Sequence, residues 1–297
     1  MNAVKQATSH IRHAIPTSVS ASSKLAGARQ VADFRPQYPS MVFKYLAEMT
    51  PKRDTVADIA CSTGHRTVGL APHFTKVYGI DSNIEKLHRA QRADNILYIP
   101  STSDATTLDS NSIDLVTVST SLFFLNHAKF FAETQRILKP ETGTLGVIAH
   151  TYLPNISPEV DRLVHHVWRT LGEHGYIPPQ RLNVVEWDIM DKIVIPQGFK
   201  EICGPIVEAT SNNSAIPATK TNGGHPRYSH ITQWTLEDLL HYIRTWEYTI
   251  VAQNQDNHDP VAPLQKLLEE AWAADANTPK DVRWEFRLRL ARKTADA

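Results

Sequence analysis

A small-residue loop followed by an acid at the end of a short apolar run is a pattern typical of nucleotide binding. The loop occupies residues 60–64, directly after the apolar run 56–59, and the acid is Asp81 at the end of the next apolar run. In a strand, loop, helix and strand unit, the loop cradles a nucleotide-like ligand and the acid accepts hydrogen bonds from the ribose hydroxyls. The sequence therefore predicts a site for a ligand that contains a ribose.

The spacing inside the loop separates two cofactors. Dinucleotide-binding loops place small residues at their first, third and sixth positions. Here the small residues are Ala60, Ser62 and Gly64, and the sixth position is occupied by His65. This spacing favours S-adenosylmethionine over a dinucleotide.

The elements that must position this loop alternate along the chain. We expect helices near 38–49, 64–72, 83–93 and 127–138, and strands near 55–59, 76–80, 96–99, 113–118 and 143–150. Such alternation predicts an α/β fold with a mostly parallel sheet and helices on both faces. Ligands of these sheets bind at the carboxyl ends of the strands.

The end of the chain has a different period. Apolar residues from Val282 to Leu290 alternate with Arg283, Glu285, Arg287 and Arg289. A period of two predicts a strand with one apolar and one charged face. We interpret these arginines as structural residues that pair with helix carboxylates.

Several segments resemble a known family. The matching segments are Phe34-Arg35-Pro36-Gln37-Tyr38-Pro39, Ser103-Asp104-Ala105, Phe130-Phe131-Ala132-Glu133, Arg136-Ile137-Leu138-Lys139-Pro140, Tyr242-Ile243-Arg244-Thr245-Trp246 and Val282-Arg283-Trp284 through Arg292-Lys293. Together with the loop, they make residues 30–150 and 232–293 similar to class I S-adenosylmethionine-dependent methyltransferases. The resemblance is to the type 11-like, small-molecule branch that includes fungal trans-aconitate and cantharidin methyltransferases.

The resemblance implies a fold and a division of the chain. The fold is a Rossmann-like, mostly parallel seven-stranded sheet with helices on both faces and a helical substrate cap. Residues 1–33 would form an N-terminal lid or tail, 34–150 the cofactor-binding core, 151–235 the cap insertion, and 236–297 the C-terminal helices and last strand. Within 151–235 we expect helices near 158–174 and 179–191, a strand at 200–209, and loops at 211–213 and 222–224.

The resemblance also implies which residues bind the cofactor, S-adenosyl-L-methionine. They are Arg35, Tyr38, Asp58, Ala60, Ser62, Gly64, Asp81, Ser82, Asp104, Ala105 and Ser119. In this assignment Asp81 binds the ribose, Asp104 and Ala105 bind the adenine, and Asp58 orients loop amides or the amino group of the cofactor. Asp58 and Asp104 could instead be turn or capping residues.

Two departures from the family pattern concern the reaction. Ala60 and Ser62 replace loop glycines, and a positive φ at either position would strain the backbone by about 1–3 kcal/mol. Phe123 and Phe124 stand where relatives carry His-Trp, so a family histidine near the methyl-transfer site is absent. His150, at the end of the fifth expected strand, is our candidate catalytic base, or else a histidine satisfied by hydrogen bonds beneath the cap.

We expect the methyl acceptor to contact aromatic side chains of the cap and of the Phe123-Phe124 pair. Our candidate substrate-binding residues are Phe123, Phe124, Trp168, Tyr176, Trp187, Arg227 and Trp234. Each aromatic could instead pack the cap onto the sheet, and Arg227 could bind an acceptor carboxylate or anchor the cap.

Composition excludes several classes of protein. The 31 basic and 31 acidic side chains cancel, so nucleic acid and anionic membranes are not expected partners. No apolar run approaches the roughly 20 residues of a membrane span. Two cysteines fit a reducing compartment, which we take to be the cytoplasm. Residues 1–32 contain basic but no acidic side chains, which fits a lid or a mitochondrial presequence.

The leading hypothesis is an enzyme, an S-adenosylmethionine-dependent methyltransferase acting on a small, partly apolar metabolite, with a role in natural-product biosynthesis (secondary metabolism). It needs no metal, and we expect a monomer or homodimer. One alternative is a methyltransferase fold used for a non-methylating cyclisation, pericyclic rearrangement or elimination, with the cofactor site vacant or auxiliary. Another is a non-catalytic partner in a heteromeric methyltransferase.

Overall fold

The computed structural model describes residues 36–185, 190–203, 215–216, 227–272 and 275–295. Five of the expectations above lie outside these residues: Arg35, Trp187, the N-terminal segment 1–33, the loop at 211–213 and the loop at 222–224.

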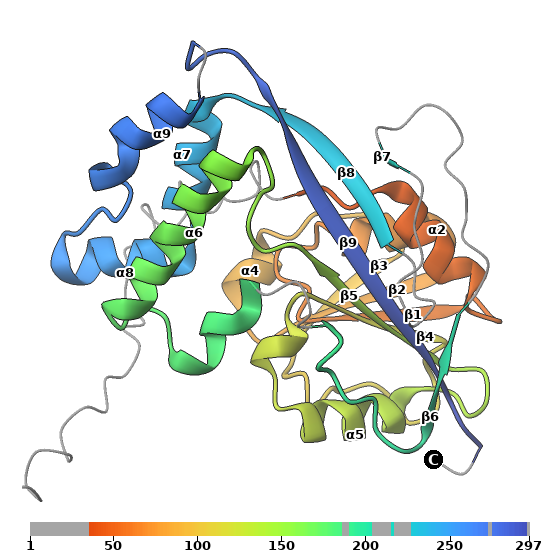
Figure 1. Ribbon diagram of the computed structural model, residues 1–297. Helices are drawn as coiled ribbons and strands as arrows, with labels where there is room; N and C mark the ends of the chain where they lie inside the picture. The colour runs from red at the N-terminus through yellow and green to blue at the C-terminus, as the bar shows by residue number, and fades with distance from the viewer. Residues whose placement is uncertain (1–35, 186–189, 204–214, 217–226, 273–274, 296–297) are drawn as a thin grey trace, which may run out of the picture. The chain divides into compact units, whose positions relative to one another are not determined.

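Five parallel strands form the core of the sheet, as the alternation predicts. They are β1 Thr55–Ile59, β2 Lys76–Asp81, β3 Ile96–Pro100, β4 Leu115–Ser119 and β5 Thr144–His150. Their order in the sheet is β3-β2-β1-β4-β5 (Figure 1). Chain connections leave β1 toward β2 on one side, while β4 and β5 lie on the other. The carboxyl end of β1 is therefore a switch point where ligands bind.

The long strand β9, Lys280–Lys293, runs antiparallel to β5 along one of its edges. Its other edge pairs with β8, Arg227–Trp234, and with β6, Phe199–Ile202, while β7, Ala215–Ile216, pairs with β8. The last strand is thus inserted between others, as in the family that the sequence resembles. The described sheet has nine strands rather than the expected seven.

The charged face of β9 is only partly as expected. Arg287 and Arg289 do pair with carboxylates, at 2.6 Å from Asp191 and 2.5 Å from Glu201. These carboxylates come from a turn and from strand β6, not from helices as predicted. Arg287 is 6% exposed, so this alternation does not separate a buried face from a solvated one.

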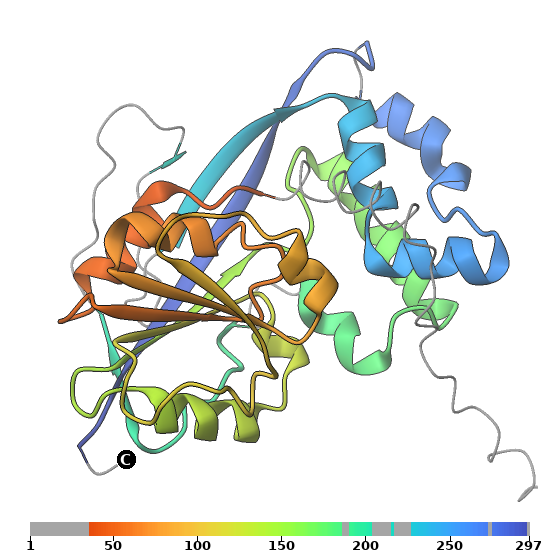
Figure 2. The ribbon, with the colours of Figure 1, turned by 180° about the vertical axis from the view of Figure 1, so that it is seen from behind.

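Helices cover both faces of the parallel strands. Helix α2, Ser40–Glu48, and helix α3, Thr67–Leu70, lie on one face, and α5, His127–Ile137, lies on the other (Figure 2). The fully buried side chains of Phe130 and Ile137 anchor α5 to the sheet. Helix α4, Ile84–His88, begins after Asn83, whose side chain accepts a hydrogen bond from the Lys86 amide.

Two helices of the core are shorter than the sequence predicts. The expected helix 64–72 is α3 followed by a 3₁₀ turn, η1 Ala71–His73, and the expected helix 83–93 ends at His88. Pro72 has no amide hydrogen to continue α3.

A second group of helices lies beside the far end of the β8–β9 pair (Figure 1). It consists of α6 Pro158–Glu173, η3 Pro179–Val185, α7 Leu236–Arg244, α8 Glu247–Asp256, η5 Ala262–Leu264 and α9 Gln265–Trp272. Helix α6 confirms the expected helix 158–174. The expected helix 179–191 is a 3₁₀ helix over its first seven residues, and strand 200–209 is described only to Ile202. No described helix is long and apolar enough to cross a membrane.

Candidate cofactor and acceptor sites

The loop after β1 has the backbone conformation that glycine adopts most easily. The φ angles of Ala60, Ser62 and Gly64 are +55°, +56° and +74°. For Ala60 and Ser62 this left-handed conformation costs on the order of 1 kcal/mol or more each. From the sequence, strain was expected only if Ala60 or Ser62 had a positive φ. The structure gives both residues a positive φ, so both positions are strained.

Hydrogen bonds to strand β2 hold the loop in this shape. The Cys61 amide donates to the Ile80 carbonyl at 2.9 Å, and the Ser62 amide donates to Asp81 Oδ2 at 2.8 Å. Asp81 Oδ1 accepts from the Asn83 amide at 2.9 Å. An ionised carboxylate can accept about four hydrogen bonds. Asp81 thus fixes the loop and retains capacity for a pair of ribose hydroxyls.

Gly64 is required by close packing as well as by its positive φ. A Cβ at this position would lie 2.0 Å from the hydroxyl oxygen of Tyr98. That hydroxyl donates to the Gln91 carbonyl at 2.6 Å and cannot move without losing the bond. No larger residue fits at the start of the turn into α3.

A pocket with a cavity volume of about 300 Å³ opens at the carboxyl ends of β1, β2 and β3. Its lining residues are Ala60, Ile80, Asp81, Ser82, Ser101, Thr102, Ser103, Asp104, Phe124, Leu125 and Asn126. Four of them, Ala60, Asp81, Ser82 and Asp104, are predicted cofactor residues, and Phe124 is a predicted acceptor residue. Of the six that were not predicted, Ile80, Ser103 and Leu125 adjoin a predicted residue in the chain, whereas Ser101, Thr102 and Asn126 do not. We call this space the cofactor pocket.

Asp58 lies beneath the loop rather than in the pocket. Its carboxylate is completely buried and accepts hydrogen bonds from the hydroxyls of Thr67 at 2.7 Å and Thr117 at 3.0 Å. Burial raises the pKa of Asp58, although Arg66 and the two hydroxyls act in the opposite direction. The geometry assigns Asp58 to joining β1, α3 and β4, and not to direct contact with a ligand.

Tyr38 contacts both the residue that follows β4 and a residue of β9. Its hydroxyl is 3.3 Å from Thr120 Oγ1, and its ring centroid is 4.9 Å from that of Phe286. Thr120 has a φ of +57°, which is rare for a β-branched residue. Beside it, the Ser119 hydroxyl is buried with no hydrogen-bond partner among the described residues. An unpaired buried hydroxyl at a strand end is a site where a ligand can supply the missing bond.

A second and much smaller pocket, with a cavity volume of about 20 Å³, lies at the ends of β4 and β5. Its lining residues are Thr120, Phe123, Ala149, His150, Thr151, Tyr152, Val184, Val185, Met190 and Arg287. We call it the acceptor pocket. The short 3₁₀ helix η2, Leu122–Phe124, separates the two pockets, because Phe123 lines this one and Phe124 lines the cofactor pocket.

His150 is oriented by the backbone. Its Nδ1 is 2.7 Å from the Thr151 carbonyl, which can only accept, so Nδ1 carries a proton. In the neutral ring, Nε2 is then the nitrogen that can accept a proton. The rings of Tyr38, Trp284 and Phe286 surround His150 with centroids about 6 Å away.

Arg287 is an acceptor-pocket residue that the sequence analysis took as structural. It lies opposite Ala149 in the β5–β9 pair, so its side chain enters the pocket with that residue. No local pattern distinguished it from Arg283 or Arg289, because all three occupy the same face of the predicted strand. Only the partner strand reveals which arginine enters the pocket.

Three predicted acceptor-binding aromatics, Trp168, Tyr176 and Trp234, lie away from both pockets. Trp168 is 2% exposed, donates from Nε1 to the Leu182 carbonyl, and contacts Tyr152, Trp246 and Tyr248. The Tyr176 hydroxyl donates to Asp256 at 2.5 Å, and Trp234 packs against Tyr242 and Trp284. Neither these three residues nor Arg227 lines either pocket.

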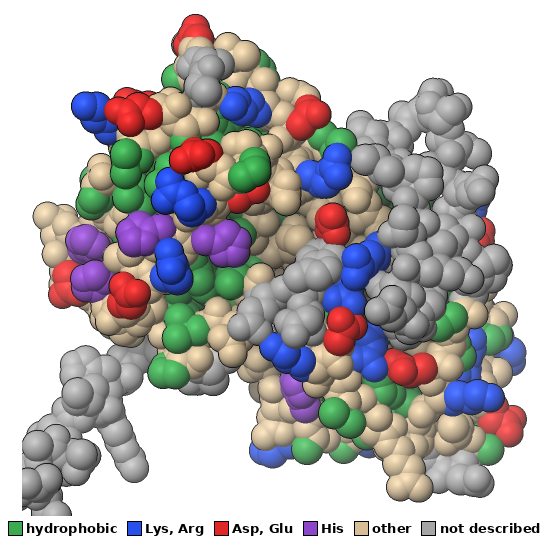
Figure 3. Space-filling view, in the orientation of Figure 1, with side chains coloured by type: hydrophobic (Ala, Val, Ile, Leu, Met, Phe, Trp, Pro, Cys, Tyr) green, Lys and Arg blue, Asp and Glu red, His purple; other side chains and the backbone are tan. Residues whose placement is uncertain are grey.

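The described residues include no group of three or more His, Cys, Asp or Glu side chains that could hold a metal ion. Histidines do gather on the surface over the helical group (Figure 3). The rings of His174 and His258 both stack on Tyr176.

Comparisons with known proteins agree with this geometry. Residues 57–145, from β1 to the start of β5, match the methyltransferase domain family of type 11. A Dictyostelium discoideum protein named as a methyltransferase is 28% identical over 285 residues, covering 94% of this chain and 98% of that protein. A Saccharomyces cerevisiae protein named as an S-adenosylmethionine-dependent methyltransferase is 23% identical over 280 residues, covering 87% and 93%.

The fold has a solved counterpart. The structure of a type II methyltransferase from Anaeromyxobacter dehalogenans superposes with a TM-score of 0.68 at 24% identity, covering 87% of this chain and 97% of that one. The strand order, the loop with its acid and the matched domain identify the chain as an S-adenosylmethionine-dependent methyltransferase. S-adenosylmethionine is its cofactor. The Asp81 carboxylate and the volume of the cofactor pocket fit that molecule.

Proposed function

We propose that this enzyme methylates a small, partly apolar metabolite bound in the acceptor pocket. The observation that carries the proposal is that two pockets lie at the carboxyl edge of the sheet and that η2 contributes a side chain to each. Five of the ten residues that line the acceptor pocket are apolar, and the other five, Thr120, His150, Thr151, Tyr152 and Arg287, carry polar groups. Because the enclosed space is about 20 Å³, roughly that of one water, a compact acceptor has to displace some of these side chains when it binds.

In this proposal the cofactor contacts are those predicted from the sequence except Asp58, with Asp81 at the ribose and Asp104 and Ala105 at the adenine. When bound, S-adenosylmethionine supplies an electrophilic methyl group. The protein holds the acceptor in line with that methyl, and such positioning can supply roughly 7–11 kcal/mol of the barrier. Phe123, Val184 and Met190 exclude water from the reacting atoms, and His150 Nε2 accepts the proton of an acceptor hydroxyl, thiol or amine.

The first test is cofactor binding. We expect saturable binding of S-adenosylhomocysteine by calorimetry, and loss of that binding in Asp81→Asn, which removes the anionic acceptor that holds both loop and ribose. The matched control is Asp94→Asn, at an exposed carboxylate that lines neither pocket. If the parent protein does not bind, or if Asp81→Asn binds as the parent does, this assignment is wrong.

The alternative is a non-methylating rearrangement, cyclisation or elimination on the same scaffold. Its support is that the acceptor pocket has aromatic and aliphatic walls and no carboxylate, which suits reactions without a strong base. Mass spectrometry of products from a metabolite panel separates the two reactions. Methylation gives a product heavier by one methylene, whereas the alternative gives unchanged mass or loss of water.

Four further points stay predictions. They are membership of the small-molecule branch similar to fungal trans-aconitate and cantharidin methyltransferases, a role in secondary metabolism, the cytoplasmic location, and the monomeric or homodimeric state. The domain boundaries at 33, 150 and 235 likewise stay as predicted. Size-exclusion chromatography with light scattering measures the oligomeric state directly.

A further inference from the structure

The connection between β3 and β4 forms one wall of the cofactor pocket and then follows helix α5. Its first part, residues 101–104, lines the pocket. A bridge between Thr102 and Ala105 and a 2.7 Å hydrogen bond from Ser101 Oγ to the Ala105 carbonyl fold this part into a tight turn. The following part, from Thr106 to Ser112, leads back to the start of β4. The pocket wall is therefore shaped by where Thr106 is held.

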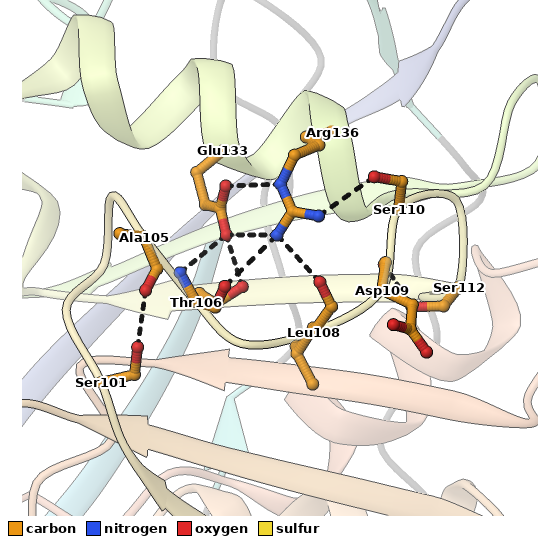
Figure 4. Close-up of polar contacts among 9 residues, drawn as sticks. All are labelled: Ser101, Ala105, Thr106, Leu108, Asp109, Ser110, Ser112, Glu133 and Arg136. Atoms are coloured by element: carbon orange, nitrogen blue, oxygen red, sulfur yellow. Dashed lines mark hydrogen bonds and ion pairs between the residues drawn. The ribbon is translucent and has the colours of Figure 1, made fainter.

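Glu133 of α5 holds Thr106 by two hydrogen bonds to a single carboxylate oxygen. Oε1 accepts from the Thr106 amide at 2.7 Å and from its hydroxyl at 2.5 Å (Figure 4). Hydrogen bonds from Arg136 and from Thr106 keep the pKa of Glu133 below its usual range. The carboxylate is therefore ionised at neutral pH, and charge strengthens both bonds to Thr106.

Arg136, one turn further along α5, completes the arrangement. Its guanidinium donates to both Glu133 oxygens, at 2.8 Å from Nε to Oε2 and 2.7 Å from Nη2 to Oε1. The same group donates to the Leu108 carbonyl at 2.8 Å, the Thr106 carbonyl at 3.3 Å and Ser110 Oγ at 3.1 Å. One planar fork thus joins the helix to three residues of the connection (Figure 4). A lysine could not make these bonds together.

We propose that Glu133 and Arg136, here called the α5 clamp, are positioning residues for the adenosine end of the cofactor pocket. Neither residue lines the pocket. They act through Thr106, which is covalently next to Ala105 and two residues from Asp104. This inference rests on the proposed function, which places adenine beside Asp104 and Ala105.

Two ligands separate a positioning role from general stabilisation. S-adenosylhomocysteine contains adenosine and an amino acid, whereas 5′-methylthioadenosine contains only the adenosine half. We expect Glu133→Gln and Arg136→Lys to raise the dissociation constants of both ligands on the order of 10-fold, by the same factor for each, because loss of a charged hydrogen bond displaces the shared half. Thr106→Val removes only the hydroxyl hydrogen bond, so it should raise both dissociation constants by a smaller factor. This variant replaces the clamp variants in the test if they fold poorly.

Lys139→Gln is the matched control. Lys139 lies just beyond the end of α5 and forms a 2.8 Å ion pair with the buried Asp114, at the opposite, amino end of β4. This change should lower the melting temperature without changing either dissociation constant. In hydrogen exchange, the Thr106 amide should lose protection in Glu133→Gln and keep it in Lys139→Gln.

The results have distinct meanings. Unchanged affinities in the clamp variants, or equal losses of affinity in Lys139→Gln, would overturn the positioning role while leaving the cofactor assignment intact. A rise limited to S-adenosylhomocysteine would also overturn it, because the clamp would then act on the amino-acid end. Absence of binding in the parent protein would overturn the proposed function and this inference together.

Discussion

At the scale of single residues, Ala60 and Ser62 have positive φ angles. This left-handed backbone conformation costs more free energy for alanine and serine than for glycine. We expect Ala60→Gly and Ser62→Gly each to raise the free energy of unfolding by about 1 kcal/mol, the relieved strain less the added flexibility of the unfolded chain. Because bonds to Ile80 and Asp81 already hold the loop, affinity for S-adenosylhomocysteine should change less than stability. Urea unfolding and calorimetry measure the two quantities.

Gly64→Ala is a control that should change the free energy of unfolding in the opposite direction. It keeps a positive φ and forces a Cβ against the Tyr98 hydroxyl, so it should destabilise the protein. If Ala60→Gly and Ser62→Gly also destabilise, the strain at those positions is absent in solution.

A second prediction at this scale concerns the buried carboxylate of Asp58. Burial raises its pKa from the usual 3.8, so the folded protein binds this proton more tightly than the unfolded chain does. The associated stability is fully present below the unfolded pKa and is lost as pH rises through the folded pKa. The parent should therefore lose stability relative to Asp58→Asn between acid and neutral pH.

Urea unfolding of both proteins across that pH range measures the difference. A relative gain of the parent with rising pH would show that Arg66 and the hydroxyls of Thr67 and Thr117 outweigh burial.

At the scale of elements, Arg181 of η3 connects three parts of the site. Its guanidinium lies 4.5 Å from the ring centroid of Phe124 on η2, and it donates to the Tyr248 hydroxyl of α8 at 2.8 Å. Val184 and Val185 of η3 line the acceptor pocket. Arg181 therefore holds the wall of one pocket against the wall of the other.

We expect Arg181→Met to loosen η3 and to lower the free energy of unfolding by about 1–3 kcal/mol, from the lost cation–π contact and hydrogen bond. Hydrogen exchange should accelerate in η3 and not in α2. Tyr248→Phe, which loses only the hydrogen bond, should give a smaller acceleration. Unchanged exchange in Arg181→Met would contradict the role of Arg181 in holding η3.

At the scale of the whole molecule, strand β9 belongs to both the parallel core and the helical group. It pairs with β5 along one edge and β8 along the other, and its fully buried Trp284 contacts His150, Trp234 and Tyr242. Residues from Pro36 onward form one compact unit. We therefore expect core and helical group to unfold together.

Differential scanning calorimetry should show a single transition, in which the calorimetric and van't Hoff enthalpies agree. Trp284→Ala should lower the stability of the whole unit by about 3–5 kcal/mol, and Trp284→Phe should lower it less. Two separate transitions, with only one sensitive to Trp284, would show that the helical group unfolds independently.

Acidic and basic side chains are interspersed on the face shown in Figure 3, in keeping with equal numbers of each in the sequence. Surface charge of this kind follows from composition alone.

The sequence by itself determined the parallel core, the strand ends and the loop with Asp81. These features arise from local causes: alternating periods, small residues at a turn, and an acid directly after an apolar strand. Asp81, Ser82 and Asp104 line the cofactor pocket because parallel strands present their carboxyl ends at one edge.

Only the tertiary structure decided which residues form the acceptor pocket. Arg287 enters it because β9 pairs with β5 in a register that places Arg287 opposite Ala149, far away in the sequence. Trp168 does not line it, because α6 packs beside α8 and the Trp168 indole is buried against Trp246 and Tyr248. Register and packing between distant segments depend on the summed burial of many side chains, and no local pattern encodes that sum.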